Sequence, residues 1–313
     1  MLSDDVSMEF RLLPAGEFRM GSRGYDSDEE PIHRVVITQP FYMGIYPVTQ
    51  QQFAVWTQSA GIDHKNHFEG HPHHPAEDMN WFQSRDFCQW LNERCGTAIP
   101  PEYVAGLPTE AQWEYACRLM KRDGKPVAVD TEYYTGDGEA GLAQAGWFDE
   151  KWDEGSTHPV GSTEKRPTDF GLHELHGNVW EWCRDAWSED AYKLRVDGIA
   201  DPMVSAVDVD KSENDAVRVF RGGSWFNSAG NCRAACRSWG GPGIRGRIRG
   251  FRVCLFFGPA VPSQTGSAAE SEPATGDGAR RYAAAESEEA GGDVAELDLS
   301  SEIFPERSDG TKF

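Results

Sequence analysis

The sequence has no long apolar run and no basic, apolar start. Its first residues, MLSDDVSMEFRLLPAG, have neither the charged beginning nor the apolar core of a secretory signal. No apolar stretch approaches the roughly 20 residues that a transmembrane helix needs. We therefore expect a cytoplasmic protein without a membrane span.

Basic residues are scarce relative to acidic ones. The chain carries 30 Lys and Arg against 51 Asp and Glu, which gives a formal net charge of -21. Such a surface repels nucleic-acid phosphates and anionic lipids. We therefore expect no nucleic-acid partner.

Cysteines do not occur in metal-binding or disulfide patterns. There are 7 of them, an odd number, and no two have the C-x-x-C spacing of a zinc pair. Free thiols in a reducing compartment fit this usage, and most of them are expected to be small buried apolar residues.

Helical patterns are few, and the chain is rich in turn residues, with 33 Gly and 18 Pro. Helices are predicted after Thr49, over 81–96, and over 107–124, where Thr109 and Gln112 form a capping box. Short strands are predicted within 8–20, 33–48, 218–225 and 250–257. Residues 125–170 show no strong periodicity.

Composition changes sharply near the C-terminus. From Gly258 onward there are twelve acidic and four basic residues and almost no aromatic ones. Such a segment buries too little apolar surface to offset the entropy of ordering, so we predict a disordered acidic tail over 258–313. We expect residues 1–7 to be a short N-terminal lead and residues 8–257 to form a single domain. Within the tail, ELDLSSEIF (296–304) is an alternative docking motif for a partner.

The segment 218–254, RVFRGGSWFNSAGNCRAACRSWGGPGIRGRIRGFRVC, has patterned ends and an unpatterned middle. Its ends are typical of strands, whereas the middle follows neither helical nor strand periodicity. Loops that are held at both ends by a rigid scaffold often carry function. The alternative is an ordinary surface loop.

Several ordered motifs, PAGEFRMGS, LPTEAQWEYACR, GLHELHGNVWEW, RVFRGGSW and GFRVC, resemble the sulfatase-modifying-factor family, the formylglycine-generating-enzyme-like branch of the C-type lectin-like fold. The resemblance implies a single α+β domain over 8–257 with little regular secondary structure. It also places 222–252 on the ligand-binding face.

One branch of the family consists of copper-dependent enzymes, in which two cysteines after the Gly-Gly-Ser turn bind the metal and activate oxygen. When the arginines of the family pattern are aligned with Arg233 and Arg237, the cysteine positions fall on Ala229 and Ala234, which cannot ligate copper. Cys232 and Cys236 lie nearby, in an arginine-rich loop that would lower their pKa. The alternative function is therefore a metal-dependent oxidase that modifies a thiol or cysteine substrate.

Another branch consists of variable proteins that retroelements diversify at adenines, and the segment resembles their template with its asparagines replaced. Trp239 cannot arise from an AAC codon in this way and needs another origin. The leading hypothesis is a non-catalytic ligand-binding or display protein for an unknown protein or small molecule. Its contact candidates within 225–249 are Phe226, Asn227, Ser228, Gly230, Cys236, Ser238, Trp239, Ile244, Arg247 and Ile248.

The sequence contains two candidate metal sites. The resemblance implies a structural calcium ion at GLHELHGNVWEW, held by Glu174, Gly177, Asn178, Val179 and Glu181. The alternative is that Asn178 satisfies buried backbone groups. Five histidines of one loop form a second candidate metal cluster, although an exposed loop is favoured there: His64, His67, His71, His73 and His74.

Overall fold

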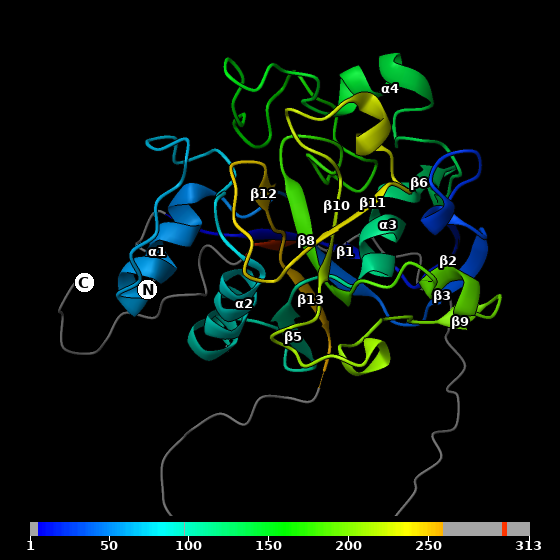
Figure 1. Cartoon of the computed structure of the whole chain (residues 1–313), viewed down its shortest axis with the longest axis horizontal. Coiled ribbons are helices and arrows are strands. Elements are labelled where there is room, and N and C mark those ends of the chain that lie inside the picture. The colour runs from blue at the N-terminus through cyan, green and yellow to red at the C-terminus, as the bar shows by residue number, and fades with distance from the viewer. Residues whose placement is uncertain (1–5, 97, 259–295, 299–313) are drawn as a thin grey trace, which may run out of the picture.

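The computed structural model describes residues 6–96, 98–258 and 296–298, and the folded part mixes helices with small sheets (Figure 1). The helices are α1 (Gln50–Ala60), α2 (Trp81–Cys95), α3 (Glu110–Arg118), α4 (Gly138–Ala145) and α5 (Ala191–Leu194). Short 3-10 turns are η1 (Ser27–Glu29), η2 (Val207–Val209) and η3 (Ala229–Cys232). This α+β arrangement confirms the expected fold class.

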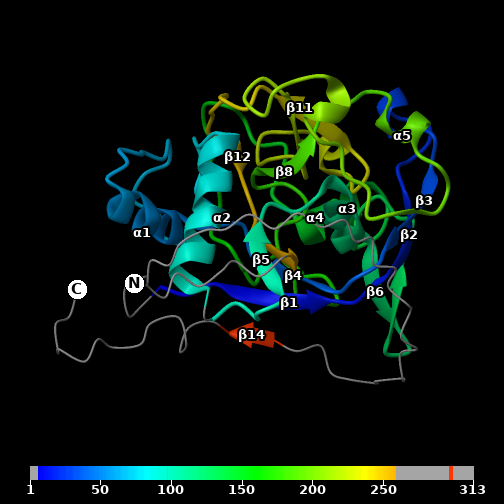
Figure 2. The same cartoon turned by 90° about the horizontal axis from the view of Figure 1, so that it is seen from below.

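Two sheets form the framework (Figures 1 and 2). One has the order β14-β1-β4-β13-β5, built from β14 (Glu296–Asp298), β1 (Glu9–Leu13), β4 (Phe41–Gly44), β13 (Cys254–Phe257) and β5 (Tyr103–Gly106). The other has the order β11-β10-β8-β12, built from β11 (Arg237–Gly240), β10 (Arg218–Arg221), β8 (Trp180–Ala186) and β12 (Arg249–Gly250). The segment after β10 therefore returns through β11 and β12 before it enters the first sheet as β13.

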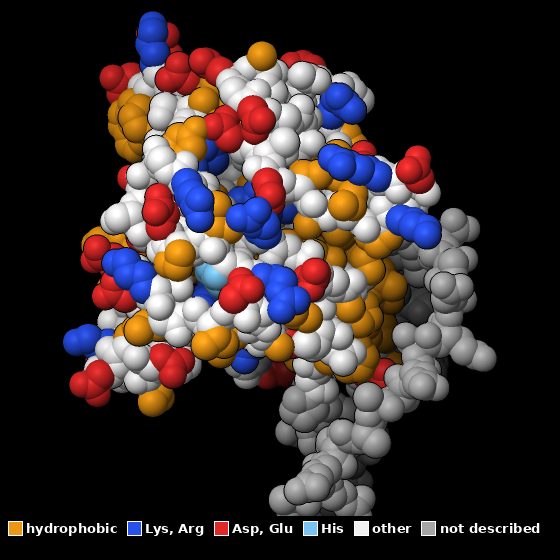
Figure 3. Space-filling view, turned by 90° about the vertical axis from the view of Figure 1, so that its right-hand side faces the viewer, with side chains coloured by type: hydrophobic (Ala, Val, Ile, Leu, Met, Phe, Trp, Pro, Cys, Tyr) orange, Lys and Arg blue, Asp and Glu red, His pale blue; other side chains and the backbone are white. Residues whose placement is uncertain are grey.

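Two smaller sheets complete the described part. They are β2 (Gly16–Met20), β3 (His33–Ile37) and β9 (Ile199–Ala200) in one, and the hairpin of β6 (Leu119–Arg122) and β7 (Lys125–Ala128) in the other. Figure 3 views the side that carries β2, β3 and β9, where positive and negative side chains are interspersed. No strongly basic stripe appears on this face.

The helix starts confirm the capping predictions. Thr49 caps α1 and Thr109 caps α3, each in a reciprocal box with the glutamine three residues later. The apolar faces of α1 and α2 meet through aromatic rings, with Phe53 and Phe87 stacked at 5.8 Å between centroids. Phe251, just before β13, closes this cluster at 5.4 Å from Phe87.

Two predictions of secondary structure were wrong. The third helix ends at Arg118 rather than near 124, because the chain becomes extended and forms the β6–β7 hairpin. Its turn uses Asp123 and Gly124, both with positive φ, which is the turn that an Asp-Gly pair favours. Within 125–170, expected to be irregular, residues 138–145 form α4.

The lead and the tail fall largely outside the described residues. Of the predicted tail, the structure describes Gly258 and Glu296–Asp298, and the latter pair antiparallel with β1. The rest of the 296–304 docking motif is not described. Within the described residues, no helix is long and apolar enough to cross a membrane.

Candidate functional site

The candidate site is the segment 222–252, which leaves β10 through a glycine turn. Gly222 and Gly223 have φ of 100° and 73°. A Cβ on Gly223 would lie 2.4 Å from the Cys232 sulfur, so glycine is required there for conformation and for space. Trp225, fully buried, donates its indole N–H to the Arg247 carbonyl at 3.2 Å and so ties the two ends of the loop together.

Buried arginines anchor this segment to the rest of the domain. Arg237 forms a two-pronged ion pair with Glu110, at 2.6 and 3.0 Å. Arg233 does the same with Glu29, at 2.7 and 2.9 Å. Arg221 pairs with Glu114, and Arg252 pairs with Glu181 at 2.8 Å. Each pair joins the segment to an element far away in the sequence.

These pairs determine the electrostatics of the segment. Burial alone would raise the pKa of Glu110, but Arg237 and Arg221 lower it to about 2. Burial would lower the pKa of Arg221 and Arg237, but the acidic groups around them, Glu110 among them, raise it, so both guanidiniums stay charged. They act as internal anchors and do not form a basic patch.

Cys232 and Cys236 are buried below the loop surface, which corrects two predictions. Burial, with Cys236 nearby, raises the pKa of Cys232, and burial chiefly raises the pKa of Cys236 to about 12. The expected lowering by arginines is outweighed by burial: Arg233 and Arg221 do lower the pKa of Cys236, but burial and the nearby Glu29 raise it more. Cys236 is only 2% exposed, so it is not a surface contact.

The remaining contact candidates are either exposed or half-buried. Phe226, Trp239 and Ile244 are exposed at 39%, 54% and 41%, so this one loop presents three large apolar side chains to solvent. Ser228 and Gly230 are also exposed. Half-buried positions are Asn227, Ser238, Arg247 and Ile248.

An aromatic cluster forms around Phe226. Trp152, from the loop after α4, lies edge-to-face with Phe226 at 4.8 Å and is itself 42% exposed. The Arg247 guanidinium lies 3.7 Å from the Trp152 ring centre and donates to its carbonyl at 2.8 Å. Trp152 was not among the predicted contact residues, although it is one of two tryptophans, with Trp147, in the polar stretch 125–170. The side chain of Asn227 already has a hydrogen-bond partner within the domain, because its oxygen accepts from the Trp180 indole N–H at 2.8 Å.

Trp239 lies on β11, and Ile244 lies in the β11–β12 connection that follows it. Trp239 pairs across from Val219 in the sheet, and its ring lies 6.0 Å from that of Trp187. A Cβ on Gly240 would lie 3.1 Å from Ile244, so this position is confined. The connection is tied to the start of α2, where Trp81 N–H donates to the Pro242 carbonyl at 3.0 Å.

The side chains of the predicted calcium loop already have protein partners. The side-chain oxygen of Asn178 accepts from the backbone N–H of His158 at 3.0 Å, and the side-chain amide of Asn178 donates to the His158 carbonyl at 3.1 Å. Asn178 thus satisfies backbone groups, which was the alternative to calcium binding. Glu181 is engaged by Arg252 and by the Trp113 indole at 2.8 Å. Gly177 and Val179 are buried beside them.

Glu174 keeps one buried carboxylate oxygen without a partner. Burial raises the pKa of this group to about 8. The five residues fit calcium poorly, because only Glu174 offers a free side-chain oxygen. Calcium binding at this loop stays a prediction.

The histidine loop brings rings together without forming a ligand set. His71 and His74 stack at 4.5 Å, while His74 contacts the Thr157 hydroxyl at 3.0 Å. No group of three or more His, Cys, Asp or Glu side chains in the described ranges is arranged to hold a metal ion. The preferred interpretation, an exposed loop, agrees with the exposure of His67, His71 and His73.

Known proteins resemble most of this chain. Serine/threonine-protein kinase pkn1 of Chlamydia pneumoniae is 26% identical over 268 residues, which cover 79% of this chain but 38% of the kinase. The chain thus spans little more than a third of that relative. The formylglycine-generating enzyme of Streptomyces coelicolor is 28% identical over 297 residues, covering 77% of this chain and 87% of the enzyme.

Solved structures share the fold. Treponema denticola variable protein 1 superposes with a TM-score of 0.62 at 24% identity, covering 80% of this chain and 95% of that one. PvdO from Pseudomonas aeruginosa gives 0.60 at 25% identity, covering 79% and 93%. The family model of the sulfatase-modifying factor enzyme 1-like domain matches residues 5–255. The chain therefore belongs to the family of sulfatase-modifying factor enzyme 1-like domains.

Proposed function

We propose that this protein is a non-catalytic binding module whose recognition surface is the 225–249 loop. The observation that carries the proposal is the contrast between buried arginines and exposed apolar side chains in and next to one segment. Arg221, Arg233, Arg237 and Arg252 are buried against glutamates, whereas Phe226, Trp239 and Ile244 are exposed. Rigid aromatic tips on a fixed framework are how protein paratopes obtain contact area at low entropic cost.

Diversification of the loop by a retroelement is part of this proposal. The stretch 232–235, CRAA, resembles the fixed part of a diversified template, and all four residues are buried. The following stretch 236–241 resembles the variable part of such a template. Cys236, Arg237 and Gly240 within it are also buried, however, so substitution there would disturb the core. The proposal therefore restricts useful variation to exposed and half-buried positions. Similarity in fold to Treponema denticola variable protein 1 is compatible with it.

The burial of the two thiols argues against the alternative function, a copper-dependent oxidase. Copper binding needs accessible thiolates, and Cys232 and Cys236 are buried with raised pKa. Ala229 and Ala234 stand where the family's enzymes place their cysteines, and Ala234 is 1% exposed. We expect no oxygen uptake by the copper-treated protein with a cysteine-containing peptide. Copper-dependent uptake that is abolished by C232A/C236A would contradict the proposal.

Binding itself is tested by comparing two triple variants in affinity capture from lysate of the native host. F226A/W239A/I244A removes the exposed tips of the loop. The control L194A/V196A/V207A removes apolar side chains exposed at 79%, 71% and 82% elsewhere. The proposal expects a partner that the wild type and the control retain and the loop variant loses. A partner that the loop variant retains equally would count against it.

A further inference from the structure

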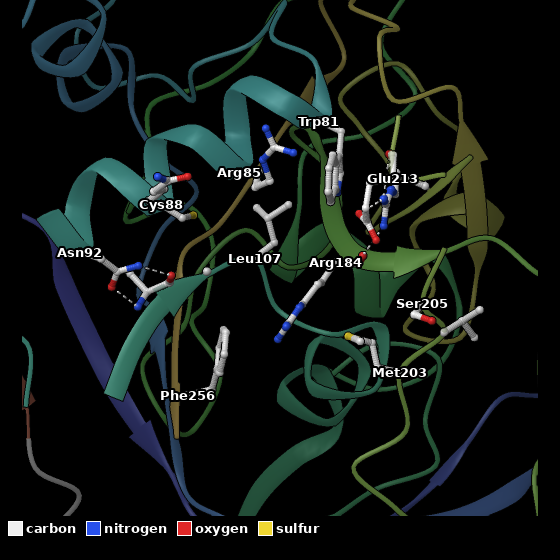
Figure 4. A pocket seen from close by; sticks show the side chains of 15 residues that line it. Trp81, Arg85, Cys88, Asn92, Leu107, Arg184, Met203, Ser205, Glu213 and Phe256 are labelled. Carbon is white, nitrogen blue, oxygen red and sulfur yellow. Dashed lines mark hydrogen bonds and ion pairs between the residues drawn. The ribbon is translucent and has the colours of Figure 1, made fainter. Parts of the chain in front are cut away.

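A second candidate site lies away from the 225–249 loop, in a groove below α2. Its first hollow has a volume of about 390 Å³ and lies between α2, β5, β8 and the segment before β10 (Figure 4). A second hollow of about 310 Å³ adjoins it, and the two share Arg184, Met203 and Phe256. We call the two hollows together the groove, and Arg184 lines both of them.

Arg184 is unusual among the arginines of this region. It is the exposed position of β8, whose other residues are buried. Its guanidinium lies 5.0 Å from the Phe256 ring centre. Among the described residues no carboxylate pairs with it, whereas the neighbouring Arg218, also in the lining, is paired with Glu213. A guanidinium supported by an aromatic face can direct its N–H donors at a carboxylate.

The walls of the groove are largely apolar, and its charges favour an anion. Trp81, Leu107, Met203 and Phe256 contribute apolar surface (Figure 4). Arg85, at the α2 side, lies 5.5 Å from the Trp81 ring centre and pairs only with the half-exposed Asp86. The first hollow contains three arginines, Arg85, Arg184 and Arg218, and one acid, Glu213. The second hollow adds one acid, Asp201, which accepts hydrogen bonds from Thr38. Over the whole groove three arginines face two acids, so the lining has a small excess of positive charge in a chain of net charge -21.

We infer that this groove binds an organic carboxylate that carries apolar groups, with Arg184 receiving the carboxylate and the two hollows receiving the apolar parts. Because a hollow lies on each side of Arg184, an acidic residue flanked by leucines in an extended peptide has the matching pattern. A free acid with an apolar body presents the same chemistry to one hollow. The site shares no lining residue with the 225–249 loop, so it is independent of the function proposed above.

The test uses the full chain and three probes: Ac-Leu-Asp-Leu-NH2, its isosteric control Ac-Leu-Asn-Leu-NH2, and 4-phenylbutyrate. Binding is followed by side-chain guanidinium signals of Arg184 in NMR spectra and by isothermal titration. We expect saturable binding of the aspartyl peptide, at least about tenfold weaker with R184Q, because a charge-assisted hydrogen bond is lost. R94Q, an exposed arginine on α2 outside the lining, should leave it unchanged.

The outcomes distinguish the sources of the carboxylate. Binding of the aspartyl peptide but not of 4-phenylbutyrate identifies a peptide site, and the reverse identifies a site for free acids. The inference is overturned if no carboxylate probe binds saturably at up to 10 mM, if the asparaginyl peptide binds equally well, or if R184Q binds as the wild type does. Because Arg184 is exposed, R184Q should fold, and an unchanged melting temperature verifies this.

Discussion

The ion pair between Arg233 and Glu29 offers the sharpest test of the scaffold. Both side chains are nearly inaccessible, at 4% and 0% exposure, and two hydrogen bonds of 2.7 and 2.9 Å join them. Arg233 also donates to the Gly230 carbonyl at 2.9 Å, inside the loop. The perturbation is R233M, which keeps the length of the side chain and removes its charge.

The expected loss follows from the charge that is left behind. Removing one partner of a buried pair costs about 3–5 kcal/mol, because the other charge stays uncompensated in the interior. For a domain of this size, 1 kcal/mol lowers the melting temperature by about 2–4 °C, so R233M should melt about 6–20 °C lower. The double variant E29M/R233M should recover part of this loss, since no buried charge remains.

The assay is urea and thermal unfolding followed by tryptophan fluorescence. R34M is the matched control, because Arg34 pairs with Glu17 at 3.0 Å but both side chains are 48% and 61% exposed. Exposed pairs contribute about 0–1 kcal/mol, so the control should change the free energy of unfolding by no more than that. If R233M destabilises no more than R34M, or if the double variant is worse than both single variants added together, the anchoring argument is refuted.

Three further predictions follow from the site. W239A truncates an exposed side chain, so it should change the free energy of unfolding by no more than about 0.5 kcal/mol. Urea unfolding measures this change, and a loss of several kcal/mol would show that Trp239 supports the fold. Native Cys232 and Cys236 should resist Ellman's reagent at pH 7.5, because burial raises the pKa of both thiols; rapid reaction of either would show that the loop opens. Burial raises the pKa of Glu174 from 4.5 to about 8. The folded state therefore favours the protonated carboxyl, which stabilises the fold fully below pH 4.5, and this stabilisation is lost as the pH rises through 8. E174Q should therefore be more stable than the wild type at pH 8.5 in the absence of calcium, as thermal melts will show, whereas calcium should raise the melting temperature only of the wild type if the ion binds there.

Local signals in the sequence predicted local structure well. Thr49 and Thr109 marked the starts of two helices, because a capping box depends on residues only three positions apart. The Gly-Gly turn and the two flanking strands of the 218–254 segment were also predicted. The Asp123–Gly124 turn carried a usable hairpin signal, but the helical pattern before it took precedence in the prediction.

The roles of individual site residues were harder to predict. The arginines of the segment looked like a basic loop because their partners, Glu29, Glu110, Glu114 and Glu181, lie up to 204 positions away in the chain. The thiol pKa values were predicted in the wrong direction because the burial of both sulfurs, which outweighs the arginines, arises only when the chain folds. Trp152 was missed because only folding brings it against Phe226.

The central claim is most directly tested in the DNA around the gene. The proposal predicts, beside a reverse transcriptase gene, a near-copy of the codons for 225–252 that differs from the gene only where the copy has adenines. Differences should fall on codons for surface positions such as Phe226, Ser228 and Ile244, and should spare Arg233 and Arg237. The absence of such a copy would contradict diversification, and replacement of the buried arginines in functional siblings would contradict the separation of scaffold from recognition surface.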